Sequence, residues 1–416
     1  MGISEIYGTK GAQLRHKRIL IGVTGSIAAI EVHHLIREIL RYEGDPIVVL
    51  SEEATRLVAI DALTWCMDKD PITQISGISE HVKWISHSEY KVDLCVICPA
   101  TANTISKLAN GIADGPVTLA ALAIFGANIP MLIVPAAHTV LLDNPIVKRN
   151  IQLLKKHNVH FLTSDEEENK YKFPSLSKLM NQIFKLIGSS EKLRGRKFLI
   201  TGGATREYLD DVRFLSNPST GISALYVAEA LNRQGAQVLL VLGEGNNLNM
   251  EDITVPTKLV RSTQEMYETI NEELSNGYHG FIAVAAVSDY KPQYQSGKIS
   301  SRQTDLTIDL VPTVKIVENI RKNFPNLYIV AYKAEVGISE EALIQKGKEL
   351  LERYQLDMVC ANWVGVAEKG FASKTNELFL IQSKAHHLHL KGSKVMIGEH
   401  IAKVITESFN IRSVDH

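Results

Sequence analysis

Two hydrophobic patterns alternate along the first half of the chain. Residues 18–23 (RILIGV) form a short apolar run typical of a buried strand, and the turn 24–26 (TGS) follows it. Behind the turn, apolar residues recur at helical spacing from Ala28 to Leu40, which predicts a helix with one buried face. Further apolar runs follow at 46–50, 93–98 and 130–134, each separated from the next by a helix-length segment. Buried strands that alternate with helices predict a parallel, doubly wound α/β sheet.

The second half of the chain repeats this opening. Residues 197–200 (KFLI) precede a Gly-rich turn, and a predicted helix then turns Ala224, Leu225, Ala228 and Leu231 inward. More apolar runs follow at 238–242, 281–286, 306–311, 328–331 and 357–362. Two further apolar runs, at 377–382 and 387–392, lie so close together in the sequence that they predict an antiparallel hairpin at the sheet edge. Because the periodicity lapses at 188–196 (GSSEKLRGR), we predict two domains, 1–187 and 188–416.

Composition narrows the class of protein. The 416 residues include 45 Lys plus Arg and 46 Asp plus Glu, so no global field favours nucleic acid or an anionic membrane as partner. No apolar run reaches the roughly 20 residues that span a bilayer, and the first 18 residues lack the core of a signal peptide, so we expect a cytoplasmic protein.

Cysteine and histidine clusters are interpreted as structural. Cys95 and Cys98 spell C-x-x-C inside an apolar run, where side chains three apart face opposite sides of a strand, so the pair is expected to consist of buried free thiols. His386, His387 and His389 lie in the predicted edge hairpin, and we expect ordinary strand residues there instead of a metal site.

Turns rich in Gly, Ser and Thr follow the predicted strands of the first half. Parallel strands place their carboxyl ends at one edge of a sheet, where ligands of open α/β sheets bind. The residues expected to converge there are Gly25, Ser26, Ser51, Pro99, Ala100, Thr101, Asn103 and Thr104. Hydroxyl groups and a helix N-terminus at this edge are suitable donors to a phosphate, although single turns of this kind are more often helix caps.

The ordered segments TGSIAA (24–29), SEEATR (51–56), PATANTISKLANGIADG (99–115) and PAAHTVLLDNP (135–145) resemble the flavin-dependent phosphopantothenoylcysteine decarboxylase family. The resemblance covers nearly the whole first half and implies a flavoprotein domain whose cofactor, flavin mononucleotide (FMN), is the electron acceptor in a decarboxylation. His81 matches the family's catalytic histidine, a residue suited to proton transfer near neutral pH.

Two departures from the decarboxylase pattern concern catalysis. The family's P-A-M-N is Pro135-Ala136-Ala137-His138 here, so His138 would replace the asparagine, a change that resembles archaeal members. The bacterial flap cysteine has no counterpart, because no Cys occurs between Cys98 and Cys360. The segment 166–175 (EEENKYKFPS) resembles an archaeal flap, and we hypothesise that Lys170, Tyr171 or Lys172 closes the site and supplies the proton.

The second half raises the question of which phosphate its glycine-rich turn binds. TGGATREYLDD (201–211) is not the G-x-G-x-x-G of dinucleotide-binding proteins. Tyr294 to Lys298 spells Y-x-x-x-K, but Pro292 and Gly297 exclude the helix that an oxidoreductase of that type needs. An NAD(P) oxidoreductase is therefore disfavoured.

The segments 200–221 (ITGGATREYLDDVRFLSNPSTG), 283–292 (AVAAVSDYKP), GKISS, AYKAE and CANWVG resemble, in order, the phosphopantothenate-cysteine ligase family. The resemblance implies a Rossmann-like domain that makes an acyl-cytidylate from 4'-phosphopantothenate and CTP with Mg²⁺ or Mn²⁺, which cysteine then attacks. Asn217 would hold the acyl intermediate and Lys298 the triphosphate, and Asp289 would face metal or ribose. Other implied nucleotide-binding residues are Ala283, Val284, Ala285, Val314, Lys315, Ile316, Val317, Tyr332, Lys346 and Arg353.

The ligase pattern also has departures. The family's S-S-G-K-M is Ser219-Thr220-Gly221-Ile222-Ser223 here, and a lysine pair is replaced by Ser300-Ser301, so positive charge is lost at two places. Solvated helix residues remain the alternative interpretation of Lys346 and its neighbours.

Together the resemblances imply a bifunctional enzyme of coenzyme A biosynthesis that forms phosphopantothenoylcysteine and decarboxylates it to 4'-phosphopantetheine. Two alternatives stay open: a ligase with a flavin-binding or oligomerising but non-decarboxylating first half, and a noncatalytic flavin-binding regulator. By family analogy the flavin domains form trimers, the ligase domains dimers, and the whole a homo-oligomer up to a dodecamer.

Overall fold

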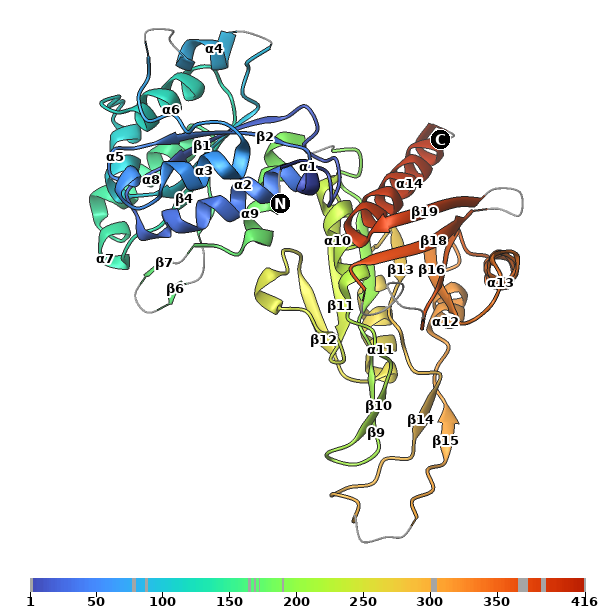
Figure 1. Cartoon of the computed structure of the whole chain (residues 1–416). Helices are drawn as coiled ribbons and strands as arrows, with labels where there is room; N and C mark the ends of the chain where they lie inside the picture. Colours follow the sequence, from blue (N-terminus) through green and yellow to red (C-terminus); the bar gives the residue numbers. More distant parts are fainter. Residues whose placement is uncertain are drawn as a thin grey trace. The chain divides into compact units, whose positions relative to one another are not determined.

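The computed structural model divides the chain into two compact units, Met1–Ser189 (unit 1) and Ser190–His416 (unit 2), shown in Figure 1. It describes residues 3–76, 80–86, 89–163, 166–167, 170–171, 173–188, 191–300, 305–365, 373–382 and 387–414. Within these ranges no helix is long and apolar enough to cross a bilayer, and a cytoplasmic location stays a prediction.

Unit 1 contains a five-stranded parallel sheet in the order β2-β1-β3-β4-β5. Its strands are β1 (Arg18–Val23), β2 (Asp45–Leu50), β3 (Leu94–Ala100), β4 (Met131–Pro135) and β5 (Val159–Phe161). The apolar runs predicted as strands in this half are β1 to β4, and β5, which is only three residues long, was not predicted. This order is that of flavodoxin-like sheets, whose ligand site lies at the carboxyl ends of the strands between β1 and β3.

Helices cover both faces of this sheet (Figure 1). The longer helices are α2 (Val32–Arg41), α3 (Ile60–Met67), α4 (Glu80–Ser86), α5 (Ala102–Ala109), α6 (Pro116–Gly126), α8 (Pro145–Lys156) and α9 (Leu176–Gly188). Short pieces complete the unit: α1 (Ile3–Ile6), α7 (Thr139–Leu142), β6 (Glu166–Glu167), β7 (Lys170–Tyr171) and the 3₁₀ turns Ile27–Glu31 and Ala54–Arg56. Cys95 and Cys98 are buried, free thiols on β3, as expected.

Unit 2 contains an eight-stranded sheet in the order β12-β11-β8-β13-β16-β17-β18-β19. The strands are β8 (Lys197–Gly202), β11 (Gln237–Gly243), β12 (Thr257–Val260), β13 (Gly280–Ala283), β16 (Tyr328–Glu335), β17 (Met358–Trp363), β18 (Thr375–Ile381) and β19 (His387–Ser393). The first six are parallel in the Rossmann order 3-2-1-4-5-6, and the last two add the antiparallel edge hairpin. The predicted doubly wound α/β class and edge hairpin are confirmed.

Two hydrophobic cores lie on the two faces of this sheet. One packs under α10 (Ile222–Arg233) and α14 (Lys394–Val414), and all four residues predicted to face inward on the first helix are buried there. The other packs under α11 (Thr263–Leu274), α12 (Ile316–Asn323) and α13 (Glu340–Arg353). A 3₁₀ turn at Met250–Asp252 completes the unit.

One predicted strand of the sheet was wrong. Residues 306–311 were expected to join it, but only β15 (Leu310–Pro312) is a strand, and it pairs antiparallel with β14 (Tyr290–Pro292). These two strands and the ribbon of β9 (Arg206–Tyr208) and β10 (Phe214–Ser216) extend away from the sheet of unit 2 as an arm (Figure 1). The run has the apolar composition of a buried strand, but its apolar residues are exposed on the arm. The sequence alone does not distinguish these two cases.

His387 and His389 of the edge hairpin are strand residues. His389 Nε2 lies 3.0 Å from Glu377 Oε1, and its ring stacks on Phe379 at 4.6 Å between centroids, while His387 meets the same ring edge-on. His386 lies outside the described residues. No group of three His, Cys, Asp or Glu suited to a metal ion occurs in the described part of the chain.

Candidate active sites at the strand ends

A pocket of about 980 Å³ lies at the carboxyl ends of β1, β3 and β4 in unit 1. This volume is at the upper end of the range of ligand pockets, roughly 300 to 1,000 Å³, and the walls are mainly apolar. The residues that line it are Gly25, Ser26, Ile27, Ala28, Ile30, Glu31, His34, Thr101, Ala102, Asn103, Ala136, Ala137, His138, Leu141, Phe173, Pro174, Ser175 and Leu176. The structure thus brings together five predicted site residues: Gly25, Ser26, Thr101, Asn103 and His138.

Hydrogen bonds between the turns fix the shape of this pocket. The Thr24 hydroxyl donates to the carbonyl of Pro99 at 2.8 Å and accepts from the Thr101 N–H at 3.0 Å, which joins the turns after β1 and β3. A Cβ atom at Gly25 would lie 2.5 Å from Glu53 Cβ, so only glycine fits where this turn passes the next loop. The start of α5 is open toward the pocket through Thr101 and Asn103.

Five predicted residues do not line this pocket. Ser51 Oγ accepts, at 3.2 Å, from the N–H of Ala54, the first residue of a 3₁₀ turn. Thr104 is buried, with its hydroxyl 3.0 Å from that of Thr101, which itself caps α5. Pro99 and Ala100 contribute backbone at the end of β3. His81 lies on α4, and its Nδ1 is buried without a hydrogen-bond partner among the described residues.

Sequence reasoning missed the apolar wall of the pocket. Ile27, Ile30 and Leu141 line it although they are exposed, and Phe173, which belongs to the flap segment 166–175, also lines it. Large apolar residues next to a glycine turn that do not belong to the apolar face of the following helix are the sequence signal that could have identified this wall. Lys170 and Tyr171 lie on β7, but their side chains and the whole of Lys172 lie outside the described part.

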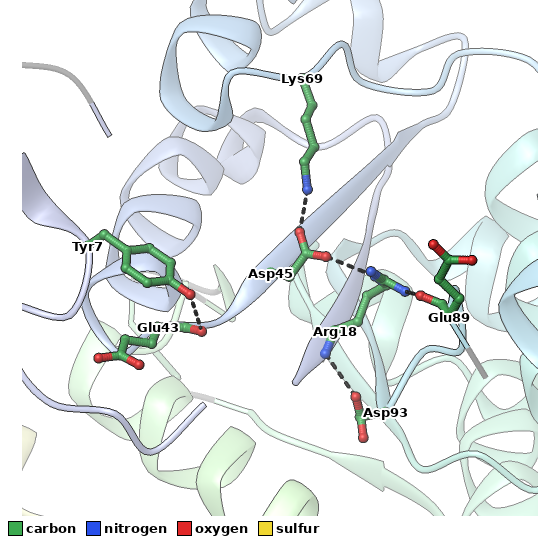
Figure 2. A network of polar contacts seen from close by, with 7 residues as sticks. All are labelled: Tyr7, Arg18, Glu43, Asp45, Lys69, Glu89 and Asp93. Atoms are coloured by element: carbon green, nitrogen blue, oxygen red, sulfur yellow. Dashed lines mark hydrogen bonds and ion pairs between the residues drawn. The ribbon is translucent and has the colours of Figure 1, made fainter. Parts of the chain in front are cut away.

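A second cavity of unit 1, about 730 Å³ in volume, lies at the amino ends of the strands, opposite the first pocket. Charged side chains of opposite sign that line it pair with one another (Figure 2). Arg18 donates from Nε to Asp45 at 2.8 Å and from Nη1 to the Glu89 carbonyl at 2.6 Å, and Lys69 also pairs with Asp45. The Arg18 backbone N–H donates to Asp93 at 2.8 Å. Burial raises the pKa of Asp45, but Lys69 and Arg18 outweigh this effect and lower it. This network joins the amino ends of β1 and β2 and needs no ligand.

In unit 2 a small cavity of about 40 Å³ lies at the N-terminus of α10. Its lining consists of Gly203, Ser219, Thr220, Gly221, Ile222, Ser223, Ala224, Val284, Tyr332, Asn362, Asn376 and Lys394. Val284 and Tyr332 were predicted as ligand residues. Asn362, Asn376 and Lys394 were not, although Asn362 belongs to the recognised segment CANWVG.

Asn217 fixes one turn of unit 2 to another. Its side-chain N–H groups donate to the carbonyls of Ala286 and Val287, both at 3.1 Å. The neighbouring Ser216 hydroxyl donates to the Thr205 carbonyl at 2.8 Å. The SNPSTG turn is therefore attached to the segment that follows β13, at the switch point between β8 and β13.

Two aspartates of the motif REYLDD fix the loop that carries Lys298. Asp210 is fully buried and accepts from the N–H groups of Val212, Arg213 and Ile299 at 2.6 to 3.0 Å. Burial raises the pKa of Asp210, but these backbone bonds and the Arg213 charge outweigh it and lower the pKa to about 2. Asp211 accepts from the Gly297 N–H at 3.0 Å. Lys298 itself is exposed.

Three of the charged residues predicted for the nucleotide, Asp289, Lys315 and Lys346, belong to two ion-pair groups. Lys315 Nζ lies 2.6 Å from Asp289 Oδ1, so the predicted metal ligand is paired with a predicted nucleotide residue. Glu335 binds Lys333 and Lys346, each at 2.9 Å. Arg353 is exposed at the end of α13.

The predicted nucleotide residues lie on both faces of the sheet. Val284 and Tyr332 pack toward the core under α10 and α14. The others named from β13 and α12 pack toward the opposite core: Ala283, Ala285, Val314 and Val317. Ile316 is buried in that core, so only its backbone can face a ligand.

Comparison with known proteins identifies the family of each half of the chain. A family model described as flavoprotein matches residues 8–188, and one described as DNA/pantothenate metabolism flavoprotein C-terminal domain matches residues 193–409. The coenzyme A biosynthesis bifunctional protein CoaBC of Thermococcus kodakarensis is 37% identical, and the match covers 91% of this chain and 92% of that protein. CoaBC of Methanocaldococcus jannaschii is 33% identical over 96% of this chain and 95% of that protein. A solved C-terminal domain of a CoaBC protein is 25% identical with a TM-score of 0.43, over 55% of this chain and 100% of that domain. The chain belongs to the family of coenzyme A biosynthesis bifunctional CoaBC proteins.

Proposed function

We propose that this chain performs two consecutive steps of coenzyme A biosynthesis. Unit 2 joins cysteine to 4'-phosphopantothenate with CTP, and unit 1 decarboxylates the phosphopantothenoylcysteine to 4'-phosphopantetheine. The observation that carries the proposal is membership of the bifunctional family along the whole chain, with a ligand-sized pocket at the strand ends of unit 1 and the ligase motifs at those of unit 2.

The ligase reaction needs an activated carboxylate. The carboxylate of phosphopantothenate attacks the α-phosphorus of CTP and pyrophosphate leaves. The amine of cysteine then attacks the acyl carbon, and CMP leaves with the new amide in place. A neutral amide such as Asn217 can bond the acyl group without adding charge beside the phosphate.

The charged residues of unit 2 are assigned to the nucleotide and its metal. Lys298, on the loop fixed by Asp210 and Asp211, is assigned to the triphosphate. Mg²⁺ usually binds through one or two carboxylates together with substrate phosphates, so Asp289, exposed and paired with Lys315, fits a metal that arrives with CTP.

The pocket of unit 1 fits FMN. Its apolar walls suit a flavin ring, and Ser26, Thr101 and the start of α5 offer donors to a phosphate. When bound, FMN supplies the electron acceptor for the cysteine end of the substrate. His138, which lines the pocket, is assigned the substrate contact that asparagine makes in the family, as a hydrogen-bond donor. His81 is assigned to proton transfer. Lys170, Tyr171 or Lys172 is assigned the final proton donation.

A homo-oligomer is part of the proposal. His81 does not line the pocket of its own chain, and we assign it to a site completed by a second copy. Exposed apolar residues on the arm of unit 2, among them Phe214, Tyr290 and Leu310, suit a dimer contact between ligase units. Trimers of the flavin units and a dodecamer follow by family analogy.

The test is a coupled assay with the purified whole chain. Phosphopantothenate, cysteine, Mg²⁺ or Mn²⁺, and either CTP or ATP are supplied, and pyrophosphate, carbon dioxide and phosphopantetheine are measured. We expect pyrophosphate with CTP, and carbon dioxide from a protein that purifies yellow with flavin. Release of pyrophosphate without carbon dioxide, even when phosphopantothenoylcysteine is supplied directly, would show that only the ligase half is active. Loss of both products would overturn the proposal.

A further inference from the structure

Three buried side chains of unit 2 form a hydrogen-bonded network behind the motif TRE (205–207). Thr205, Glu207 and Thr263 are each at most 3% exposed. The Glu207 carboxylate accepts from the Thr263 hydroxyl at 2.6 Å and from the Thr263 backbone N–H at 2.8 Å. The Thr263 hydroxyl lies 3.0 Å from that of Thr205, whose oxygen lies 3.4 Å from the backbone nitrogen of Ser288. This Glu207 network joins β9 and the start of α11 to the segment that follows β13.

The carboxylate fixes the direction of every hydrogen bond in the Glu207 network. A carboxylate only accepts, so the Thr263 hydroxyl must donate its one proton to Glu207. The Thr205 hydroxyl must then donate to Thr263, which leaves its lone pairs for the Ser288 N–H. Either threonine hydroxyl could donate in an isolated pair, and Glu207 removes that choice. The acceptor that meets the Ser288 N–H is therefore set by a carboxylate two residues further along the network.

The surroundings of Glu207 stabilise its negative charge. Thr263 is the first residue of α11, and its N–H is one of the groups at a helix start that have no partner within the helix. A carboxylate at this position satisfies that N–H and interacts favourably with the helix dipole. These two contributions offset part of the cost of burying a charge. The network therefore ends in an anion that this part of unit 2 can hold.

The other end of the network lies in the segment that carries Asp289. Ser288 and Asp289 lie beyond the end of β13, and their backbone groups have partners outside the sheet. The Thr313 hydroxyl donates to the Ser288 carbonyl at 2.5 Å, and the Thr313 N–H donates to the Asp289 carbonyl at 2.9 Å. Thr205 accepts from the Ser288 N–H. Together these bonds fix the backbone from which the Asp289 carboxylate projects.

We propose that Glu207 is a positioning residue of the ligase, which acts through Thr263 and Thr205 on Asp289. The inference rests on the proposed function, in which Asp289 faces the metal that arrives with CTP. The Asp289 side chain is largely exposed and pairs only with the mobile amine of Lys315, so the backbone decides where its carboxylate lies. Mg²⁺ demands near-ideal geometry at about 2.0 to 2.1 Å, and a small displacement of this backbone therefore weakens the contact.

The experiment measures binding of CTP with Mg²⁺ to the whole chain by titration calorimetry. Thr205→Val removes the hydroxyl and nearly keeps the shape of the side chain, whereas Thr205→Ser keeps the hydroxyl. Loss of this bond predicts about 2- to 12-fold weaker binding in Thr205→Val and nearly wild-type binding in Thr205→Ser. Phosphopantothenate, titrated alone, should bind all three proteins alike.

Variants of Glu207 and a matched control extend the test. Glu207→Leu leaves Thr263 without its acceptor and should weaken binding of CTP with Mg²⁺ at least as much as Thr205→Val. Glu207→Gln keeps an acceptor oxygen and should weaken it less. Thr406→Val is the control, because Thr406 is also buried and donates one hydroxyl bond of 2.7 Å, to the Ala402 carbonyl on α14. It should bind CTP like wild type.

A double-mutant cycle separates positioning from a general loss of structure. Asp289→Asn removes the charge on which the Glu207 network is proposed to act, so Thr205→Val should add little to its effect on binding of CTP with Mg²⁺. Effects of the two substitutions that simply add would overturn the proposal, as would wild-type binding by Thr205→Val. Because Glu207→Leu buries no charge and could fail to fold, the Thr205 variants decide the question in that case.

Failure of this inference and failure of the proposed function give different results. Carbon dioxide release from supplied phosphopantothenoylcysteine reports on unit 1 and should be unchanged in every variant. If wild type binds CTP with Mg²⁺ and shows the coupling between Thr205 and Asp289 but forms no pyrophosphate, the proposed ligase function fails while the positioning role stands. If wild type forms pyrophosphate but the coupling is absent, only the positioning role fails.

Discussion

Replacement of Asn217 by aspartate tests how the SNPSTG turn is held over the strand ends. The side chain keeps its size, but its two donated bonds of 3.1 Å to the Ala286 and Val287 carbonyls are lost. A net contribution of about 0.5 to 1.5 kcal/mol per bond gives about 1 to 3 kcal/mol. A carboxylate also places negative oxygen against two carbonyl oxygens, so Asn217→Asp should lose more than Asn217→Ala.

The assay follows the two halves of the reaction in one protein. Pyrophosphate release from CTP and phosphopantothenate should fall about 5- to 150-fold in kcat/KM, which is the same energy expressed as a rate ratio. Carbon dioxide release from supplied phosphopantothenoylcysteine should not change. Asn232→Asp is the matched control, because Asn232 also donates one side-chain bond of 3.1 Å to a carbonyl, that of Ala236, but at the far end of α10. Ligase activity of Asn217→Asp within twofold of wild type would refute the reasoning.

Four further changes test other parts of the structure. Asp210 has a pKa lowered to about 2, below its unfolded value near 3.9, so its contribution to stability is present above about pH 4 and is lost as the pH falls toward 2. Urea midpoints of wild type and Asp210→Asn should differ at pH 7 and converge at low pH; parallel curves would contradict this. Gly202→Ala places a Cβ atom 2.4 Å from that of Ala224, so α10 must shift. The free energy of unfolding should fall by roughly 1 to 3 kcal/mol, as for an overpacked contact, and ligase activity should fall with it. An unchanged melting temperature counts against this prediction. His138→Ala should slow carbon dioxide release about tenfold or more, whereas His138→Asn, which restores the family residue, should keep most of it because both side chains can donate a hydrogen bond. Equal rates for His138→Ala and wild type would show that this contact does not contribute to decarboxylation. Glu335→Gln releases two lysines from their 2.9 Å pairs and should raise the KM for CTP severalfold with kcat little changed; an unchanged KM would show that the pairs do not position a phosphate-binding amine.

The sheets could be predicted because buried parallel strands are nearly continuous apolar runs. Residues 18–23 and 197–200 each precede a turn and a helix, and both are the first strand of their sheet. The arm could not be predicted in the same way. Residues 306–311 have the composition of a strand, but whether a strand joins a sheet or extends from it depends on long-range pairing, and apolar residues exposed on an arm look like core residues in sequence.

The candidate sites, like the fold, contain some residues that the sequence could predict and others that it could not. Turns that follow a strand, such as Thr24–Ser26, converge because the topology forces the carboxyl ends of parallel strands to one edge. Asn376 and Lys394 reach the cavity of unit 2 by another route, since one begins an antiparallel strand and the other begins the last helix. No local pattern marks them: the packing of α14 beside α10 brings Lys394 to the turn, and the pairing of β18 with β17 brings Asn376 there.

The position of β13 explains why the predicted nucleotide residues lie on two faces. Side chains alternate along a strand and its extension, so Val284 faces the core under α10 while Ala283 and Ala285 face the core under α12. In the proposed ligase reaction, two substrates that each carry phosphate must bring a carboxylate to a phosphorus atom, and their negative charges repel over any short distance. Predicted ligand residues on both faces of the sheet edge would let the phosphate groups stay apart while the reacting ends meet above the strands. Asn217, bonded to the segment just past β13, lies at that edge, beside the cavity at the N-terminus of α10.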